Sequence, residues 1–305
     1  MMLRFRRWLT LSLLTFLAMF LAIACSGGTP FVNETAIRIG SKDFAEQFIL
    51  AEMYALILED NGFAVERKLN LGGTPVAQSS LIQGEIDFYP EYTGTALLGV
   101  LKLPGNSDRQ KVYETVARGY KEQFNLIWLA PSPMNNTQAL VVTQAGVEKY
   151  GLKTISDLIA NANRVTLIGP PEFQDREDGL PGLEEVYGKF TLKEYKSVDA
   201  GLRYQGLIEG EADVAVGFST DGEISAYNLV MLEDDKNLFP PYQVAPVMRQ
   251  ELLDRHPEII DILNSVTIRL TDEAMQKLNY EVTGKQREPA DIANEFLQEE
   301  GLLKR

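Results

Sequence analysis

The feature that most constrains this chain is an alternation of strand-like and helix-like segments in its first third. Short apolar strand patterns cover residues 36–40, 63–69 and 86–89. Apolar residues at helical spacing fill the intervals between them, first after Asp43 and then from Thr74, which we expect to be the N-cap of its helix. A β-α-β-α-β order predicts a mostly parallel sheet with helices on its faces.

A second alternation of the same kind follows residue 137. Apolar strand patterns at 137–142, 164–168 and 212–218 are separated by helical patterns. Two such series in one chain indicate two α/β lobes. The segment 239–242 contains two prolines beside a tyrosine and lies between apolar stretches. Because proline fixes φ, this segment is stiff, and we expect a hinge between the lobes there.

Residues 1–25 predict an export signal rather than a part of the fold. A basic stretch with three arginines precedes an apolar run from Leu9 to Ala24, which is too short and wrongly flanked for a good membrane span. The run ends in Leu21-Ala22-Ile23-Ala24-Cys25, which resembles a bacterial lipobox with lipid attached to Cys25. The alternative is an ordinary signal peptide with an incidental cysteine. Residues 26–35 then form a flexible tether.

The charge of the chain disfavours polyanionic partners. Removal of residues 1–25 takes away three arginines and no acidic residue, so the formal charge changes from −14 to −17. Nucleic acids and anionic membranes are bound chiefly by Lys and Arg, so an acidic chain is a poor candidate for either. We expect no nucleic-acid partner and contact with a membrane only through the lipid anchor.

The inventory of reactive side chains argues against an enzyme. His256 is the only histidine and Cys25 the only cysteine of the sequence. His256 stands between a short helical pattern and Pro257, where a histidine is usually a surface or capping residue. The sequence contains no H-E-x-x-H, C-x-x-C, G-x-S-x-G, Walker or G-x-G-x-x-G motif. We expect no catalysis, no cofactor and no metal site.

Two cationic side chains stand in turns that suit an anion. Lys42 lies where the first strand turns into a helix, and backbone N–H groups at a helix start favour negative charge. Asp43 and Glu46 fit a capping box for that helix. Arg176 lies in a charged loop and suits a bidentate carboxylate clamp. For both cations the alternative is a solvated side chain, with Arg176 paired to acidic neighbours.

The stretch Asp87–Thr95 is the first candidate for a ligand site. It joins a strand end to a turn and displays Tyr89 and Tyr92 there. An aromatic ring face attracts a cation, so the stretch suits an apolar or cationic ligand. The alternative is that both tyrosines are packing residues. Tyr89 has an odd spacing from Tyr92 and points elsewhere on an extended chain, so we expect a structural role for it.

Seven short stretches resemble one protein family and occur in the family's order. They are Gly40–Gln47, Asp87–Thr95, Asn135–Thr137, Arg176–Gly179, Asp199–Gln205, Ser219–Gly222 and Phe239–Tyr242. In combination they resemble the substrate-binding lipoproteins of osmoprotectant (quaternary amine) ABC transporters, which take up glycine betaine, carnitine or choline. The stretches span nearly the whole chain after the export signal.

The resemblance implies a fold and a division of the chain. The fold is that of a two-lobed periplasmic binding protein of type II, with two mixed-sheet α/β domains joined by two hinge crossings. The crossings are expected near Gln138-Ala139 and Tyr242-Gln243. Lobe 1 then comprises residues 36–138 and 243–305, and lobe 2 comprises residues 139–242.

The resemblance also implies the ligand site. Tyr92, Phe218 and Tyr242 match an aromatic box around a trimethylammonium group. Lys42, Thr95 and Arg176 match contacts of a ligand carboxylate. The predicted ligand-binding set is completed by Asn136 and Gln138.

Two positions depart from the family's pattern. Gln138 stands where many relatives have a box tyrosine, and Phe218 replaces another. Phenylalanine keeps a π face, whereas Gln138 removes one wall and adds an amide. Either glycine betaine binds weakly, or the ligand is a larger or more polar one that bonds to Gln138. Tyr204 lies in a helical pattern and is expected in the core.

The sequence therefore predicts a lipid-anchored, extracytoplasmic binding protein, in the periplasm or at the cell surface. It would capture a quaternary-ammonium osmoprotectant and deliver it, as a monomer, to an ABC permease. The alternative is a protein of the same fold that binds an amino acid or another polar zwitterion.

Overall fold

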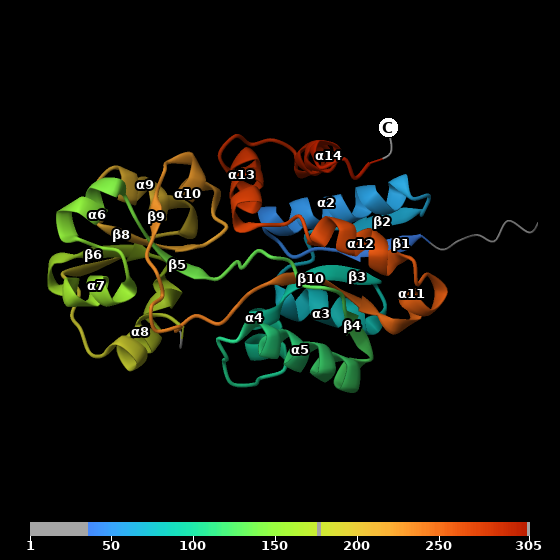
Figure 1. Ribbon diagram of the computed structural model, residues 1–305, viewed down its shortest axis with the longest axis horizontal. Coiled ribbons are helices and arrows are strands. Elements are labelled where there is room, and N and C mark those ends of the chain that lie inside the picture. The colour runs from blue at the N-terminus through green and yellow to red at the C-terminus, as the bar shows by residue number, and fades with distance from the viewer. Residues whose placement is uncertain (1–35, 176–177, 304–305) are drawn as a thin grey trace, which may run out of the picture. The chain divides into compact units, whose positions relative to one another are not determined.

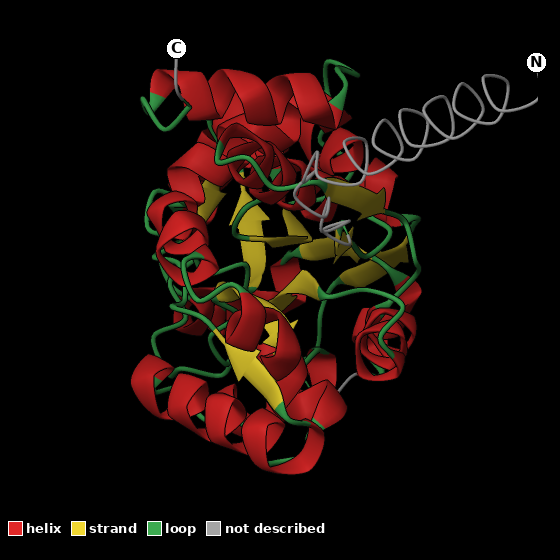
Figure 2. Ribbon diagram, turned by 90° about the vertical axis from the view of Figure 1, so that its right-hand side faces the viewer, coloured by secondary structure: helices red, strands yellow, loops and turns green. Residues whose placement is uncertain are grey.

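The computed structural model describes residues 36–175 and 178–303. The predicted export signal, Cys25, the tether and Arg176 lie outside the described residues. The described elements form two five-stranded sheets with helices around them, and Figure 2 shows the strands inside a surrounding layer of helices.

The first sheet combines strands from the start and the end of the chain. Its order is β2 (Val65–Lys68), β1 (Ile37–Gly40), β3 (Phe88–Tyr92), β10 (Val244–Arg249) and β4 (Leu126–Trp128). β1 pairs parallel with β2 and β3, as the β-α-β-α-β pattern predicts. β10 pairs antiparallel with β3 and β4, so the sheet is mixed.

Helices cover both faces of the first sheet. They are α2 (Ala45–Asp60), α3 (Thr74–Gln83), α5 (Arg109–Phe124), α11 (Gln250–Arg255), α12 (Ile259–Thr267), α13 (Asp272–Thr283) and α14 (Pro289–Glu299), with a short α4 (Thr93–Thr95) and a π-helical turn at Ala96–Val100. Successive residues of a strand point to opposite faces. Phe88 and Tyr92 accordingly belong to the core under α2, and Tyr89 to the core under α5. The fully buried Tyr89 confirms the structural role expected for it.

The second sheet is built from the middle of the chain. Its order is β7 (Glu194–Ser197), β6 (Thr166–Gly169), β8 (Val214–Phe218), β5 (Gln138–Val142) and β9 (Val230–Met231). β6 pairs parallel with β7 and β8, and β5 pairs antiparallel with β8 and β9. Its helices are α6 (Gln144–Tyr150), α7 (Ile155–Ala160), α8 (Leu180–Tyr187), α9 (Arg203–Ile208) and α10 (Gly222–Ala226), with short 3-10 turns at Ala162–Arg164, Pro171–Gln174 and Ala200–Leu202. Tyr204 of α9 is buried in this core, which confirms the prediction for it.

Two segments connect the sheets and run side by side. One leads from β4 to β5 and the other from β9 to β10, as Figure 1 shows in green and orange. They are joined by backbone hydrogen bonds from Ser132 N to Val244 O at 2.8 Å and from Asn136 N to Tyr242 O at 3.1 Å. Adjacent connections of this kind are where a hinge motion between two lobes is absorbed.

The helix starts differ from the predicted ones in two places. Gly73 is the N-cap of α3, so Thr74 is already helical. The capping box at α2 is wrong, because the N-cap is Phe44 and no side chain caps it. Instead, the side chain of Gln47 bonds to the backbone before the helix, where its Oε1 accepts from Lys42 N at 3.1 Å. Glu46 cannot cap the helix because its carboxylate is held by other donors, described below.

Candidate ligand-binding site

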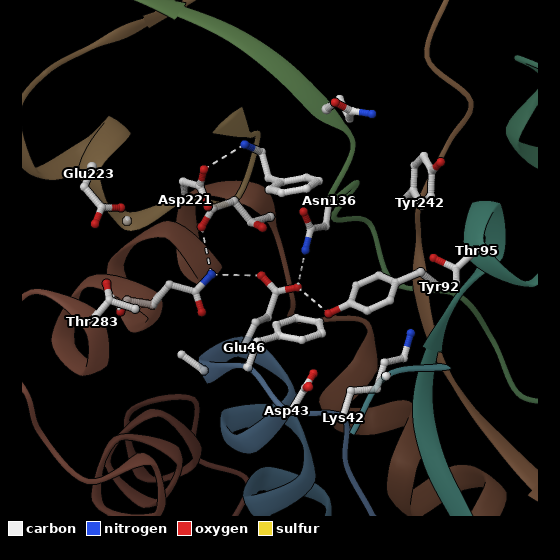
Figure 3. A pocket seen from close by; sticks show the side chains of 18 of the residues that line it. Lys42, Asp43, Glu46, Tyr92, Thr95, Asn136, Asp221, Glu223, Tyr242 and Thr283 are labelled. Carbon is white, nitrogen blue, oxygen red and sulfur yellow. Dashed lines mark hydrogen bonds between the residues drawn. The ribbon is translucent and has the colours of Figure 1, made fainter. Parts of the chain in front are cut away.

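A cavity of about 510 Å³ is lined by residues attached to both sheets. Its volume is within the range of small-molecule sites. Figure 3 shows side chains from α2, β3, both connecting segments and the turn after β8 pointing toward it. β1 and β3 are parallel and their carboxyl ends lie at the same edge, which is where open α/β sheets bind ligands.

Seven of the eight predicted ligand-binding residues lie in the lining of this cavity. They are Lys42, Tyr92, Thr95, Asn136, Gln138, Phe218 and Tyr242. Arg176, the eighth, lies outside the described residues. The seven come from five separate stretches of the chain, so their convergence depends on the tertiary fold.

Three aromatic rings reach the cavity from different elements. Tyr92, at the end of β3, is 4% exposed and stacks on Phe44 with ring centroids 6.2 Å apart. Phe218, at the end of β8, is 42% exposed although the strand before it is buried. Tyr242 approaches Gly94 so closely that a Cβ there would lie 2.8 Å from its ring, so only glycine fits at position 94.

Lys42 has a charge partner inside the protein. It is 4% exposed, its Nζ lies 2.5 Å from Oε1 of Glu91, and Nζ is 5.0 Å from the centroid of the Tyr92 ring. Glu91 is fully buried on β3. A buried ion pair satisfies its own charges. Lys42 is therefore a compensated cation at the cavity wall, not the solvated lysine of the alternative interpretation.

Gln138 is held on one side by hydrogen bonds. Its Nε2 donates to Oδ2 of Asp178 at 2.5 Å, and the residue is 6% exposed. It is the first residue of β5 and pairs with Phe218 across the second sheet. Because the amide nitrogen is bonded to Asp178, the amide oxygen is the polar atom of Gln138 best suited to meet a ligand.

A second ion pair lies at the end of β8. Arg203 is 8% exposed, and its Nη2 lies 2.5 Å from Oδ2 of Asp221. The same carboxylate accepts from Phe218 N and from the hydroxyl of Tyr204, both at 2.7 Å. Asp221 thereby fixes the backbone that carries the Phe218 ring. Gly217 leaves room for this arrangement, because a Cβ there would lie 2.0 Å from the Tyr204 hydroxyl.

Glu46 lies in the cavity and is not part of the capping box that its sequence position predicts. It is 3% exposed, and its Oε1 accepts from the Tyr92 hydroxyl at 2.7 Å and from Asn136 Nδ2 at 2.8 Å. Its Oε2 accepts from Asn279 Nδ2 at 2.8 Å. Burial raises the pKa of Glu46, while hydrogen bonds from Tyr92, Asn279, Thr220 and Asn136 oppose the rise. The signal in the sequence was its alignment with the buried helix positions Ile49, Leu50 and Met53.

Other candidate chemistries find no support in the described part of the chain. No group of three or more His, Cys, Asp or Glu side chains there is arranged to hold a metal ion. His256 is the C-cap residue of α11, as expected, and its ring packs edge-on against Phe63 at 5.4 Å. Within residues 36–175 and 178–303, no helix is both long and apolar enough to cross a bilayer.

One protein family matches nearly the whole described chain. It is described as the substrate binding domain of an ABC-type glycine betaine transport system, and the match covers residues 35–299. The chain belongs to this family. Members are substrate-binding components of ABC transporters. The chain is therefore an extracytoplasmic protein of a transport system, with a small-molecule ligand and a permease as partners.

Individual relatives agree with this membership. The chain is 34% identical over 273 residues to the ergothioneine transport permease/ergothioneine binding protein EgtU of Helicobacter pylori strain G27, a match that covers 89% of this chain and 49% of the relative. The chain thus spans about half the length of that relative. It is 35% identical over 284 residues to the carnitine transport binding protein OpuCC of Listeria monocytogenes strain 10403S, with 92% of each chain covered.

A solved structure agrees with the fold. The crystal structure described as a glycine betaine/carnitine/choline ABC transporter has a TM-score of 0.82 to this chain at 34% identity, and the match covers 88% of this chain and 100% of that one. Together with the two mixed sheets, this likeness confirms the predicted two-lobed α/β fold of a type II periplasmic binding protein.

Proposed function

We propose that the chain captures a quaternary-ammonium osmoprotectant of the glycine betaine, choline or carnitine type between its lobes and delivers it to an ABC permease. The observation that carries this proposal is the convergence of Tyr92, Phe218 and Tyr242 on one cavity. The names of the relatives support it, because carnitine, ergothioneine and glycine betaine all contain a trimethylammonium group.

The chemistry of the ligand explains the use of aromatic rings. A quaternary nitrogen has no N–H group to donate, so hydrogen bonding cannot hold it. A ring face attracts it through the ring quadrupole, by about 2 kcal/mol when the contact is desolvated. Tyr92, Phe218 and Tyr242 would form three walls of such a box, and Gln138 a fourth wall that is polar.

The remaining predicted residues would hold a carboxylate, where the ligand has one. We assign Thr95, Lys42 and Arg176 to this end of the ligand. Thr95 offers a hydroxyl, and Arg176 offers the bidentate geometry that carboxylates favour. Lys42 shares its charge with Glu91, so we expect it to contribute less than an unpaired lysine would.

Closure of the lobes would complete the box. We propose that lobe 1 comprises residues 36–138 and 243–305 and lobe 2 residues 139–242, with hinges in the two connecting segments. Tyr92 and Thr95 then belong to lobe 1 and Phe218 to lobe 2. Rotation about the connecting segments would bring the rings against the ligand from both sides.

We further propose that Cys25 carries a lipid that anchors a monomeric protein to the membrane, and that the chain catalyses no reaction. The alternative ligand, an amino acid or another polar zwitterion, is not favoured. Gln138 was the reason to consider it, and its amide nitrogen already donates to Asp178.

The test is a titration of the purified mature protein with glycine betaine, choline, carnitine and a panel of amino acids, followed by calorimetry and thermal melting. The proposal predicts binding and a raised melting temperature with one or more quaternary amines, and recovery of the ligand unchanged after long incubation. Binding confined to amino acids, or turnover of the ligand, would overturn it.

A further inference from the structure

Glu46 is the one buried carboxylate in the described lining of the cavity that has no cationic partner. Of the two cations in that lining, Lys42 is paired with Glu91 and Arg203 with Asp221. Within residues 36–175 and 178–303, no ion pair includes Glu46. An uncompensated buried charge is unfavourable, and a charge of opposite sign in the same cavity relieves it.

The neighbours of Glu46 are arranged for a carboxylate rather than a carboxylic acid. Each oxygen of Glu46 accepts from an amide N–H₂ group, which can only donate: Oε1 from Asn136 Nδ2 and Oε2 from Asn279 Nδ2. The hydroxyls of Tyr92 and Thr220 also bond to the carboxylate. A protonated acid would need an acceptor, whereas an ionised carboxylate accepts on both oxygens. Glu46 also lies in the first turn of α2, where the helix dipole favours negative charge.

The hydrogen bond to Tyr92 connects this charge to an aromatic wall. A phenol that donates to a carboxylate carries more electron density on its ring, because hydrogen bonds polarise the groups that they join. A more negative ring face attracts a cation more strongly. The burial of Tyr92 also raises the pKa of its hydroxyl well above the usual range, so the proton stays on Tyr92.

We propose that ionised Glu46 is the counter-charge of the bound quaternary ammonium, and that it makes the site prefer cationic head groups over uncharged groups of the same shape. Glu46 acts both through the Tyr92 ring and by its own field in the cavity. The inference rests on the proposed function. It adds a specificity-determining residue that lies behind the aromatic box.

The test compares choline with 3,3-dimethylbutan-1-ol. This compound has the shape of choline, with a quaternary carbon in place of the quaternary nitrogen. Glu46→Gln is expected to weaken choline binding by about tenfold or more and to leave binding of the carbon isostere within about twofold. Glu122→Gln on the exposed face of α5 makes the same charge change away from the cavity and should alter neither. Equal losses for both ligands, or no loss for choline, would overturn the inference.

A second measurement keeps the test valid if Glu46→Gln does not fold. In the unaltered protein, choline affinity should fall as the pH is lowered, because a proton on Glu46 competes with the cation, and the isostere should show no such fall. The charged groups around this part of the cavity are Lys42, Glu91, Asp221, Arg203, Glu223 and Asp43. Burial raises the pKa of Glu223 as well, so the measurement is repeated in Glu223→Gln, where the effect should persist.

The outcomes separate the two proposals. If the unaltered protein binds no quaternary amine, the proposed function fails. If it binds choline and the preference over the carbon isostere is the same with Glu46→Gln, or is independent of pH, only the role of Glu46 fails.

Discussion

At the scale of single residues, Tyr242 gives the sharpest test of the aromatic box. Tyr242→Ala should weaken quaternary-amine binding by about tenfold or more, because a desolvated ring contact contributes about 2 kcal/mol. Tyr242→Phe keeps the ring and should stay close to the unaltered affinity. Both are measured by calorimetry, with circular dichroism to confirm the fold. An unchanged affinity in Tyr242→Ala would refute the box.

Gln138 tests the departure from the family's pattern. Gln138→Tyr should tighten glycine betaine binding several-fold if the missing ring is the cause of low affinity, since it restores one π wall. Gln138→Ala removes the amide that bonds to Asp178 without adding a ring, and serves as the control. If the alanine variant tightens binding as much as the tyrosine variant does, the amide rather than the missing ring limits affinity.

The sequence located seven residues of the cavity lining because the motifs lie at strand ends and in turns. Tyr92 ends β3, Phe218 ends β8 and Gln138 begins β5, and such positions are displayed at sheet edges. Glu46 and Asn279 could not be found in this way. They are 233 positions apart and meet only because α13 packs beside the start of α2.

Glu46 also predicts a pH dependence of stability. Burial raises its pKa in the folded protein above the ordinary value of 4.5, so the folded state holds this proton more tightly than the unfolded state does. Its contribution to the free energy of unfolding is therefore greatest below pH 4.5 and is lost as the pH rises through the folded pKa. Denaturant unfolding at several pH values should show the unaltered protein losing stability relative to Glu46→Gln as pH rises. A constant difference would contradict this.

At the scale of elements, α13 connects the two sheets. It packs against α2, and it also bonds to the turn after β8 through Gln276 Nε2 to Ser219 O at 2.7 Å and Asn279 Nδ2 to Thr220 O at 2.8 Å. Asn279 therefore joins Glu46 in the cavity to the turn that carries Asp221. A helical sequence pattern does not predict this contact, because backbone propensity carries no information on which distant turn a helix meets.

The close packing of α10 on α13 can be tested at Gly222. A Cβ at this position would lie 2.5 Å from Tyr280 N and 2.6 Å from Tyr280 Cα, so one of the helices must shift. Gly222→Ala should lower the free energy of unfolding by about 1–3 kcal/mol. Gly201→Ala, where no atom lies within 4 Å of the added Cβ, is the control and should be nearly neutral in chemical denaturation. Equal stability of the two variants would show that this contact is not tight.

At the scale of the whole molecule, the alternation of strands and helices predicted two α/β series. The family resemblance predicted that the chain crosses between them twice. The fifth strand of the first sheet, β10, comes from residues 244–249. Its antiparallel place between β3 and β4 did not follow from the local pattern, which predicted a mostly parallel sheet. The return of the chain to its first sheet places Tyr242 next to Gly94, a contact between residues that lie about half of the chain apart in the sequence.

The most direct test of the account is a crystal structure of the mature protein grown with choline or glycine betaine. We predict that the quaternary nitrogen lies within about 6 Å of the ring centroids of Tyr92, Phe218 and Tyr242, on the cavity side of Glu46. A ligand bound outside this cavity, or with its trimethylammonium group turned away from all three rings, would contradict it.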